Sequence, residues 1–77
     1  MKVTLGELNT GESARVTAFL DSGSAYRRKL LAMGLTLGTC CTVRRVAPLG
    51  DPIQLEVRGF HLTIRRHEAA VVEVVRV

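Results

Sequence analysis

The chain has 77 residues, of which 47% are hydrophobic and 23% are charged. This composition excludes a disordered chain, and the length predicts a single domain, residues 1–77, with little room for a deep active-site cleft. No apolar run approaches the roughly 20 residues that span a bilayer, so direct membrane insertion is not expected. The net charge of +4 is modest and spread along the chain, as on many solvated surfaces.

The cysteine pattern and the N-terminal residues indicate in which cellular compartment we expect the protein. Cys40 and Cys41 are the only cysteines, and neighbours in sequence cannot easily bridge each other. A disulfide scaffold is therefore excluded, which fits a reducing compartment. The first residues lack the apolar stretch of a signal peptide. We therefore expect a cytoplasmic protein.

The first elements are a short helical turn and a strand. Thr4 followed by Glu7 forms a capping-box pattern, which predicts one helical turn that buries Leu5 and Leu8. From Ser13 to Phe19 small or apolar residues alternate with polar ones, which predicts a half-buried strand.

One helix is predicted, over residues Ala25–Met33. The segment 21–24 before it interrupts the strand and offers helix caps. Apolar residues at helical spacing mark one side of the helix, namely Tyr26, Leu30 and Met33. Gly34 stands where a left-handed residue ends a helix, so that Leu35 can fold back onto the last turn.

The clearest pattern is a β-hairpin. Ile53–Val57 and Phe60–Ile64 both alternate, and the two-residue connection at Arg58 pairs the apolar positions on one face, with Phe60 expected to be buried. A preceding strand, Thr39–Val46, is interrupted at Arg44-Arg45, which predicts a bulge. A proline-containing loop, Ala47–Pro52, joins that strand to the hairpin.

The remaining elements suggest a barrel. A helical turn is predicted over residues 65–70 and a last strand over Val71–Val77, with Val72 and Val74 facing the core. Five short strands and one helix in so few residues favour a closed small barrel, since closure removes exposed strand edges. We therefore predict a mainly β protein: an SH3-like barrel with one inserted α-helix.

Catalysis and metal binding are weakly supported. His61 faces Glu56 across the hairpin on the solvent side. A surface pair explains this arrangement more simply than a catalytic dyad does. No CxxC or HxxxH spacing occurs. His61, His67 and Glu68 are the only weak candidates for holding a divalent transition metal at the surface. We predict no enzyme activity and no required cofactor, and leave a surface metal open.

Nucleic acid is the main rival partner, because arginines could line one surface. Aromatic residues that could stack on bases make up only 4% of the chain, and no phosphate loop or DNA-binding motif is present. We therefore do not expect nucleic-acid binding, and keep it as an alternative.

The helix carries the strongest signal for a protein partner. Arg27, Arg28 and Lys29 form a basic run, and the apolar residues Leu30, Leu31, Met33 and Leu35 exceed what one short helix needs against a small barrel. The last strand also has outward valines. Apolar surface beside cations is typical of a protein-binding site.

The chain resembles the FeoA family, the small ferrous iron transport protein A, from about Leu5 to Val77. The resemblance rests on Tyr26-Arg27-Arg28-Lys29-Leu30-Leu31, Met33-Gly34-Leu35, the Arg45–Ile53 segment that contains Ala47-Pro48-Leu49-Gly50-Asp51-Pro52, and Leu62-x-x-Arg65-Arg66-x-Glu68. It implies an SH3-like barrel that serves the cytoplasmic side of the FeoB ferrous iron transporter.

On this basis we expect the chain to dock on the transporter through the helix and a nearby loop. The alternatives are a transition-metal sensor and a nucleic-acid binder, and self-association is left open. The expected contact residues are Arg27, Arg28, Lys29, Leu30, Leu31, Met33, Leu35, Pro48, Leu49, Asp51 and Pro52.

Overall fold

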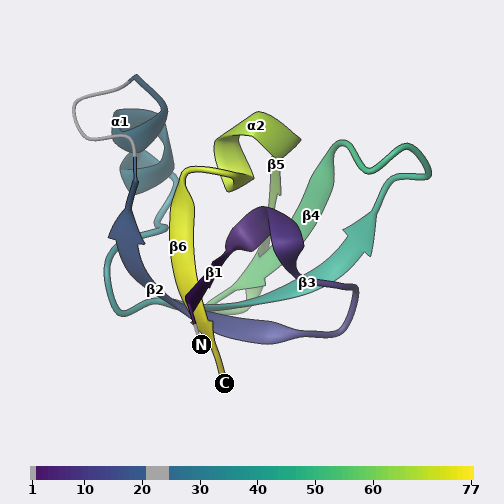
Figure 1. Cartoon of the computed structure of the whole chain (residues 1–77), viewed down its shortest axis with the longest axis horizontal. Helices are drawn as coiled ribbons and strands as arrows, with labels where there is room; N and C mark the ends of the chain where they lie inside the picture. The colour runs from purple at the N-terminus through teal and green to yellow at the C-terminus, as the bar shows by residue number, and fades with distance from the viewer. Residues whose placement is uncertain (1, 21–24) are drawn as a thin grey trace.

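The computed structural model describes residues 2–20 and 25–77, so the expected caps at 21–24 lie outside the described residues. Within these residues six antiparallel strands form one sheet in the order β1-β6-β2-β3-β4-β5. The sheet curls strongly, and α1 and α2 both lie at one end of it (Figure 1). The strands are β1 (Lys2–Thr4), β2 (Ser13–Phe19), β3 (Cys40–Val46), β4 (Ile53–Val57), β5 (Phe60–Ile64) and β6 (Val72–Arg76).

Three helical segments complete the chain: η1 (Leu5–Glu7), α1 (Ala25–Ala32) and α2 (Arg66–Ala69). In η1 the Glu7 carboxylate accepts hydrogen bonds from the backbone N–H and the hydroxyl of Thr4, at 2.7 and 3.0 Å, as the capping-box pattern predicts. Among the described residues, no helix has both the length and the apolar character needed to cross a bilayer.

The core is formed by the inward faces of the strands together with helical residues. Alternation in β4 is regular, with its first, third and fifth residues buried and the two between them half-buried. As predicted, Leu5 and Leu8 of the first turn and Val72 and Val74 of β6 are buried. Burial of so many branched aliphatic side chains supplies most of the stability of so small a domain. The buried apolar residues are Leu5, Leu8, Ala14, Val16, Leu30, Leu35, Cys41, Val43, Ile53, Leu55, Val57, Ile64, Ala69, Val72 and Val74.

The sheet differs from the expected closed barrel in two respects. A sixth strand, β1, was not predicted, because three residues are too few to show alternation. It pairs with β6, where Lys2 lies opposite Val75. Complete closure was also predicted wrongly, since β1 and β5 are the two outer strands of the order and do not pair. Helical side chains such as Leu30 join the core instead, so the interior is filled without a continuous ring of strands.

The end of α1 has the geometry of a Schellman motif. Gly34 has a φ of 101°, a region that glycine enters without a steric penalty. The N–H of Leu35 bonds to the carbonyl of Leu30 at 3.0 Å, and the N–H of Gly34 bonds to that of Leu31 at 3.1 Å. This pattern folds Leu35 back into the core, where it is fully buried.

The β4–β5 hairpin has the predicted register, in which Val57, Leu55 and Ile53 lie opposite Phe60, Leu62 and Ile64. Arg58 and Gly59 have φ values of 49° and 86°, so both central residues of the two-residue turn are left-handed. The expected burial of Phe60 is wrong, because its side chain is 50% exposed. Phe60 directly follows the turn, at the end of the hairpin where the core no longer covers it.

The predicted bulge lies in β3. The register with β4 shifts between Val43 and Arg45, so that Arg44 is the extra residue. Because a strand alternates at every residue, this insertion places Arg45 on the outer face and returns Val46 to the inner face. Val46 accordingly packs against the core, and Arg45 lies opposite the outward Gln54.

Candidate partner-binding surface

The faces of α1 have different environments. Leu30 points into the core and is fully buried. On one flank, the Tyr26 ring packs at a tilt against His67 of α2, with ring centroids 5.0 Å apart, and Lys29 donates a hydrogen bond to Glu68 of α2. Helical spacing puts Met33 on the same flank and Arg28 on the exposed side. The helix therefore presents Arg28 to solvent while its Tyr26 flank packs against α2.

Part of the predicted contact set lies in the core. Leu30 and Leu35 are both 0% exposed, so they offer no surface to a partner in the folded protein. Leu31 and Met33 are half-buried, and Arg27 and Arg28 are exposed. Helical spacing places Leu30, but not its neighbour Leu31, on one side with Tyr26 and Met33. Spacing alone does not show that Leu30 on this side is fully covered by the core.

The junction between α1 and α2 centres on a buried carboxylate. Glu68 is 2% exposed, and its Oε2 accepts a hydrogen bond from Lys29 Nζ at 2.6 Å. Its other oxygen accepts from the backbone N–H of Arg65 at 2.8 Å, which caps the first turn of α2. Burial would raise the pKa of Glu68, but the hydrogen bonds from Lys29 and Arg65 outweigh it and hold that pKa below its ordinary value of 4.5.

Replacing Glu68 by glutamine should lower stability at neutral pH by about 1 to 2 kcal/mol, because it removes a charge-assisted hydrogen bond inside the α1–α2 junction. The folded-state pKa is lowered, so this contribution is present above pH 4.5 and is lost as the pH falls through the folded pKa. Urea unfolding at pH 7 and at pH 3 should therefore show a difference between wild type and variant that shrinks in acid.

Glu56→Gln is the matched control, because that half-buried, solvent-facing carboxylate also pairs with a cation, Arg44 Nε at 2.6 Å. Solvent-facing ion pairs contribute less than about 1 kcal/mol to the free energy of unfolding. Equal effects of the two substitutions would contradict a special role for the buried Glu68.

The proline-containing loop is bonded to the start of α2. Asp51 accepts a hydrogen bond from the backbone N–H of Arg66 at 2.9 Å and lies 3.6 Å from the Arg65 guanidinium. Leu49 at the tip is 93% exposed, and Pro48 is exposed as well. Figure 1 places this loop and α1 on opposite sides of α2. The loop and the helix, which we expected to act together, therefore lie on two separate surfaces.

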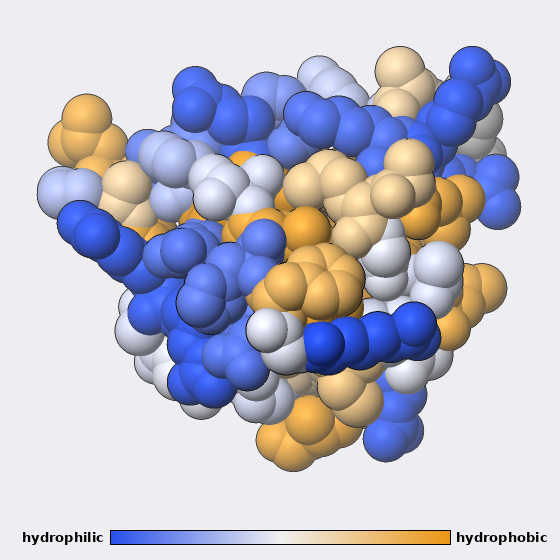
Figure 2. All heavy atoms as spheres, turned by 180° about the vertical axis from the view of Figure 1, so that it is seen from behind, coloured by the Kyte–Doolittle hydropathy of each residue, from blue (hydrophilic) through white to orange (hydrophobic). Residues whose placement is uncertain are grey.

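An apolar patch, here defined as the exposed Phe60 with the half-buried Met33 and Leu62, lies between the C-terminal end of α1 and β5. The tip of the Phe60 ring is 3.9 Å from the position that a Cβ on Gly34 would take. Met33 and Leu62 are half-buried and pack against the core. Figure 2 shows apolar atoms running from the α1 side to the middle of this face, with hydrophilic atoms beside them. Sequence reasoning missed Phe60, although its position next to the hairpin turn was the available signal.

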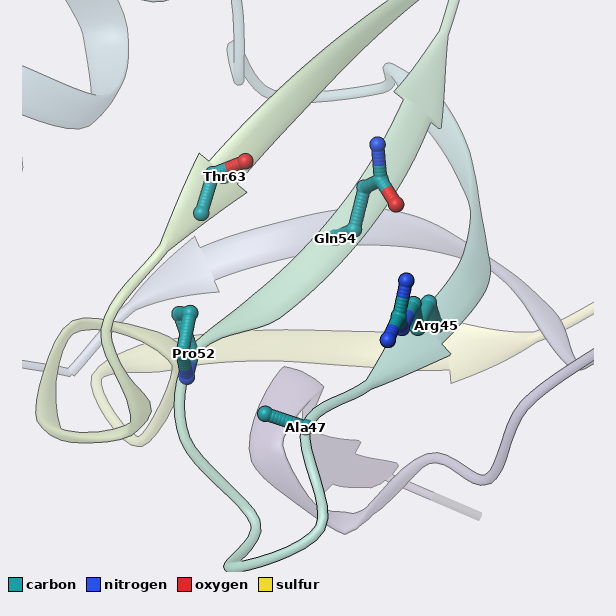
Figure 3. Close-up of a pocket in the computed structure, with 5 residues that line it drawn as sticks. All are labelled: Arg45, Ala47, Pro52, Gln54 and Thr63. Atoms are coloured by element: carbon teal, nitrogen blue, oxygen red, sulfur yellow. The ribbon is translucent and has the colours of Figure 1, made fainter.

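A shallow hollow lies on the outer face of β3, β4 and β5. It has a volume of about 270 Å³ and is lined by Arg45, Ala47, Pro52, Gln54 and Thr63. Arg45 lies opposite Gln54, and Gln54 lies opposite Thr63, so the three polar side chains form a row across three strands (Figure 3). All three side chains can donate hydrogen bonds, and none of the described residues that line the hollow is acidic.

The weak metal candidates do not form one site. His61 lies 3.8 Å from Glu56 on the hairpin, as predicted, while His67 stacks on Tyr26 and the Glu68 carboxylate is committed to Lys29. Within residues 2–20 and 25–77, no group of three or more His, Cys, Asp or Glu side chains could hold a metal ion. Cys40 is exposed and Cys41 buried, on opposite faces of β3; burial raises the pKa of the Cys41 thiol to about 11.

The arginines do not form one uncompensated nucleic-acid surface. Arg44 pairs with Glu56 at 2.6 Å, and Arg76 of β6 pairs with Glu12 at 2.9 Å. Such pairs reduce the positive potential that phosphate backbones require. Phe60 is exposed, but the tip of its ring lies next to Gly34 at the end of α1.

Comparison with known proteins identifies the family. The FeoA domain family matches residues 3–76 of the chain. The chain belongs to the FeoA family. A FeoA protein from Chlorobium tepidum is 41% identical, with a TM-score of 0.87 over 97% of this chain and 70% of that one. A zinc-complexed FeoA from Stenotrophomonas maltophilia, described as an SH3 domain protein, is 29% identical, with a TM-score of 0.81 over 95% of this chain and 89% of that one. The SH3-like fold and the link to ferrous iron transport are thereby confirmed.

A further relative joins a FeoA-like segment and a transporter in one chain. A fusion protein of Fe(2+) transport protein A and the Fe(2+) transporter FeoB from Porphyromonas gingivalis is 36% identical over 70 residues. These residues are 91% of this chain but only 8% of the fusion protein, so the chain corresponds to a small part of that relative.

Proposed function

We propose that this FeoA domain is a cytoplasmic accessory protein that binds the cytoplasmic side of a FeoB-type ferrous iron transporter. The observation that carries the proposal is the Porphyromonas gingivalis fusion, in which a segment similar to this chain is covalently joined to FeoB. A fusion holds two modules at high effective concentration, as expected for partners that act together.

The exposed surface of the FeoA domain fits such docking. Arg27 and Arg28 are exposed on α1, Leu31 is half-buried beside them at helical spacing, and the apolar patch lies at the C-terminal end of the helix. Cations beside apolar side chains steer association with an acidic protein surface, while the apolar atoms supply contact area. The loop tip at Leu49 offers a second apolar contact on the other side of α2.

The proposed role is non-catalytic. His61 is exposed and adjoins Glu56, and the one exposed cysteine, Cys40, lies on a different strand. The described hollow beside Arg45 is shallow and carries donors but no nucleophile with a neighbouring base. These features are suited to holding a partner.

The role is tested by ferrous iron uptake in cells. Deleting the gene for this chain should slow uptake of radiolabelled Fe²⁺ several-fold while the transporter remains in the membrane, and plasmid-borne wild type should restore the rate. Uptake that is unchanged by the deletion, with transporter levels equal, would contradict the proposal.

Replacing Arg28 by glutamate should weaken binding to the transporter's cytoplasmic part about three- to tenfold, mainly through slower association, and should leave the melting temperature almost unchanged. Arg28 is exposed and has no carboxylate partner among the described residues. The expected loss is measured by surface-coupled binding kinetics at low and at high salt.

Arg15→Glu is the control, because Arg15 is an exposed residue of β2, away from the exposed face of α1, and the substitution makes the same change in net charge. Equal weakening by both variants would show that only net charge matters, and full binding by Arg28→Glu would remove α1 from the interface.

A further inference from the structure

The outer edge of β5 has backbone groups without a partner strand. Among the described strands β5 pairs only with β4, and their two-residue turn makes Val57 and Phe60 a hydrogen-bonded pair. In an antiparallel ladder the pairs alternate, so the N–H and C=O groups of His61 and Thr63 point away from β4. No residue in the described part of the chain bonds to these outward groups. They therefore form a template for one more strand.

The two faces beside this edge differ in chemistry. On one face lie Phe60 and Leu62, which belong to the apolar patch at the end of α1. On the other face lies Thr63, the first residue of the polar row that continues through Gln54 to Arg45 (Figure 3). A strand added at β5 would alternate between these faces. Its side chains must therefore alternate between apolar and polar.

The charge around the edge indicates the sign of those polar side chains. Arg45 lines the hollow, and Arg58 stands at the hairpin turn; both are exposed and neither has a carboxylate partner within the described residues. The acidic groups nearby are already paired, Glu56 with Arg44 and Asp51 with the start of α2. The face beside Thr63 is therefore net positive and complementary to carboxylates. It would repel a second copy of the same basic edge.

We infer that the β5 edge is a docking site for an extended segment of a partner protein in which acidic and apolar residues alternate. The segment's backbone pairs with His61 and Thr63, its apolar side chains cover Phe60 and Leu62, and its carboxylates face the row ending at Arg45. The inference rests on the proposed function, because it takes the partner segment to belong to the cytoplasmic part of the transporter.

A peptide experiment tests the edge directly. A capped heptapeptide of alternating valine and glutamate is titrated into isotope-labelled protein, and amide chemical shifts are followed. The result expected is saturable shifts at His61 and Thr63, with binding at least tenfold weaker for the same peptide with lysine in place of glutamate. Equal binding of both peptides, or shifts confined to another strand, would overturn the inference.

Two variants at one position test the backbone pairing with the transporter's cytoplasmic part. Thr63→Pro removes the outward N–H without removing a bond to β4, because Thr63 and Gln54 form a non-hydrogen-bonded pair and proline is tolerated on edge strands. Thr63→Val keeps the N–H and is the matched control. We expect the proline variant to lose at least tenfold in affinity and the valine variant to bind like wild type.

The outcomes separate the two proposals. Binding by wild type and by both variants with equal affinity would overturn the edge site and leave the accessory role standing. Failure of wild type itself to bind would overturn the accessory role together with the transporter as the source of the segment. Should the proline variant unfold, Arg45→Gln is the deciding variant, because it leaves β5 intact. A three- to tenfold loss of affinity in this variant supports the inference, and unchanged affinity contradicts it.

Discussion

Replacing Leu30 by alanine is expected to remove most of the stability of the domain. Leu30 is 0% exposed and packs in the core below α1. Truncating a buried leucine lowers the free energy of unfolding by about 2 to 5 kcal/mol, and the whole free energy of unfolding of a domain this small is only a few kcal/mol. Thermal unfolding followed by circular dichroism should show a melting temperature lowered by more than about 10 °C, or no cooperative transition at all.

Leu31→Ala provides the matched control, because the same atoms are removed from the neighbouring position. Leu31 is half-buried on the flank of α1, so we expect a loss below about 1 kcal/mol. The pair tests the orientation of the helix about its own axis. Similar losses for the two variants, or a larger loss for Leu31→Ala, would show that α1 faces the core through a different side.

Replacing Gly34 by valine should lower the free energy of unfolding by about 2 kcal/mol. The φ of 101° at Gly34 is one that side chains with a Cβ rarely adopt, and a β-branched side chain is the least tolerant. The space itself is not the obstacle, since a Cβ there would meet only the Phe60 ring at 3.9 Å. Urea denaturation should give a lower midpoint with an unchanged slope.

Gly6→Ala is the control for the Gly34 prediction, because Gly6 does not have a positive φ and its added Cβ would lie 3.7 Å from Ala69. We expect it to change stability by less than about 0.5 kcal/mol, or to raise it slightly. If Gly34→Val melted at the wild-type temperature, the Schellman end of α1 would be misassigned.

The hairpin and the helix end could be predicted from sequence because each depends on local rules. Alternation in Ile53–Val57 and Phe60–Ile64 leaves one register that places all apolar residues on one face, and the structure has that register. Gly34 after the last apolar helical residue predicts a left-handed end, which its φ confirms. The bulge at Arg44 follows from the interrupted alternation in the same way.

The missed features depend on packing between distant segments. β1 is too short to show a period, and its strand identity comes only from pairing with β6. The incomplete closure between β1 and β5 reflects how helical residues such as Leu30 fill the core. Burial of Glu68 against Lys29 brings together residues 39 positions apart, which no local pattern indicates.

Which of the candidate contact residues are exposed could be predicted only in part. The basic residues Arg27 and Arg28 are exposed on α1 as the pattern suggested, but Leu30 and Leu35 are core residues. The apolar patch around Phe60 replaces them as the exposed apolar surface next to the helix. Sequence periodicity shows which residues are apolar and share a face, but it does not show where the core stops covering that face.

The most direct test of the accessory role is an NMR titration of the isotope-labelled chain with the soluble cytoplasmic part of the FeoB transporter from the same organism. The account predicts saturable amide shifts that cluster on the exposed side of α1 and along β5, with the core strands unaffected. A spectrum of the folded protein that shows no shifts at a several-fold excess of the partner would contradict it.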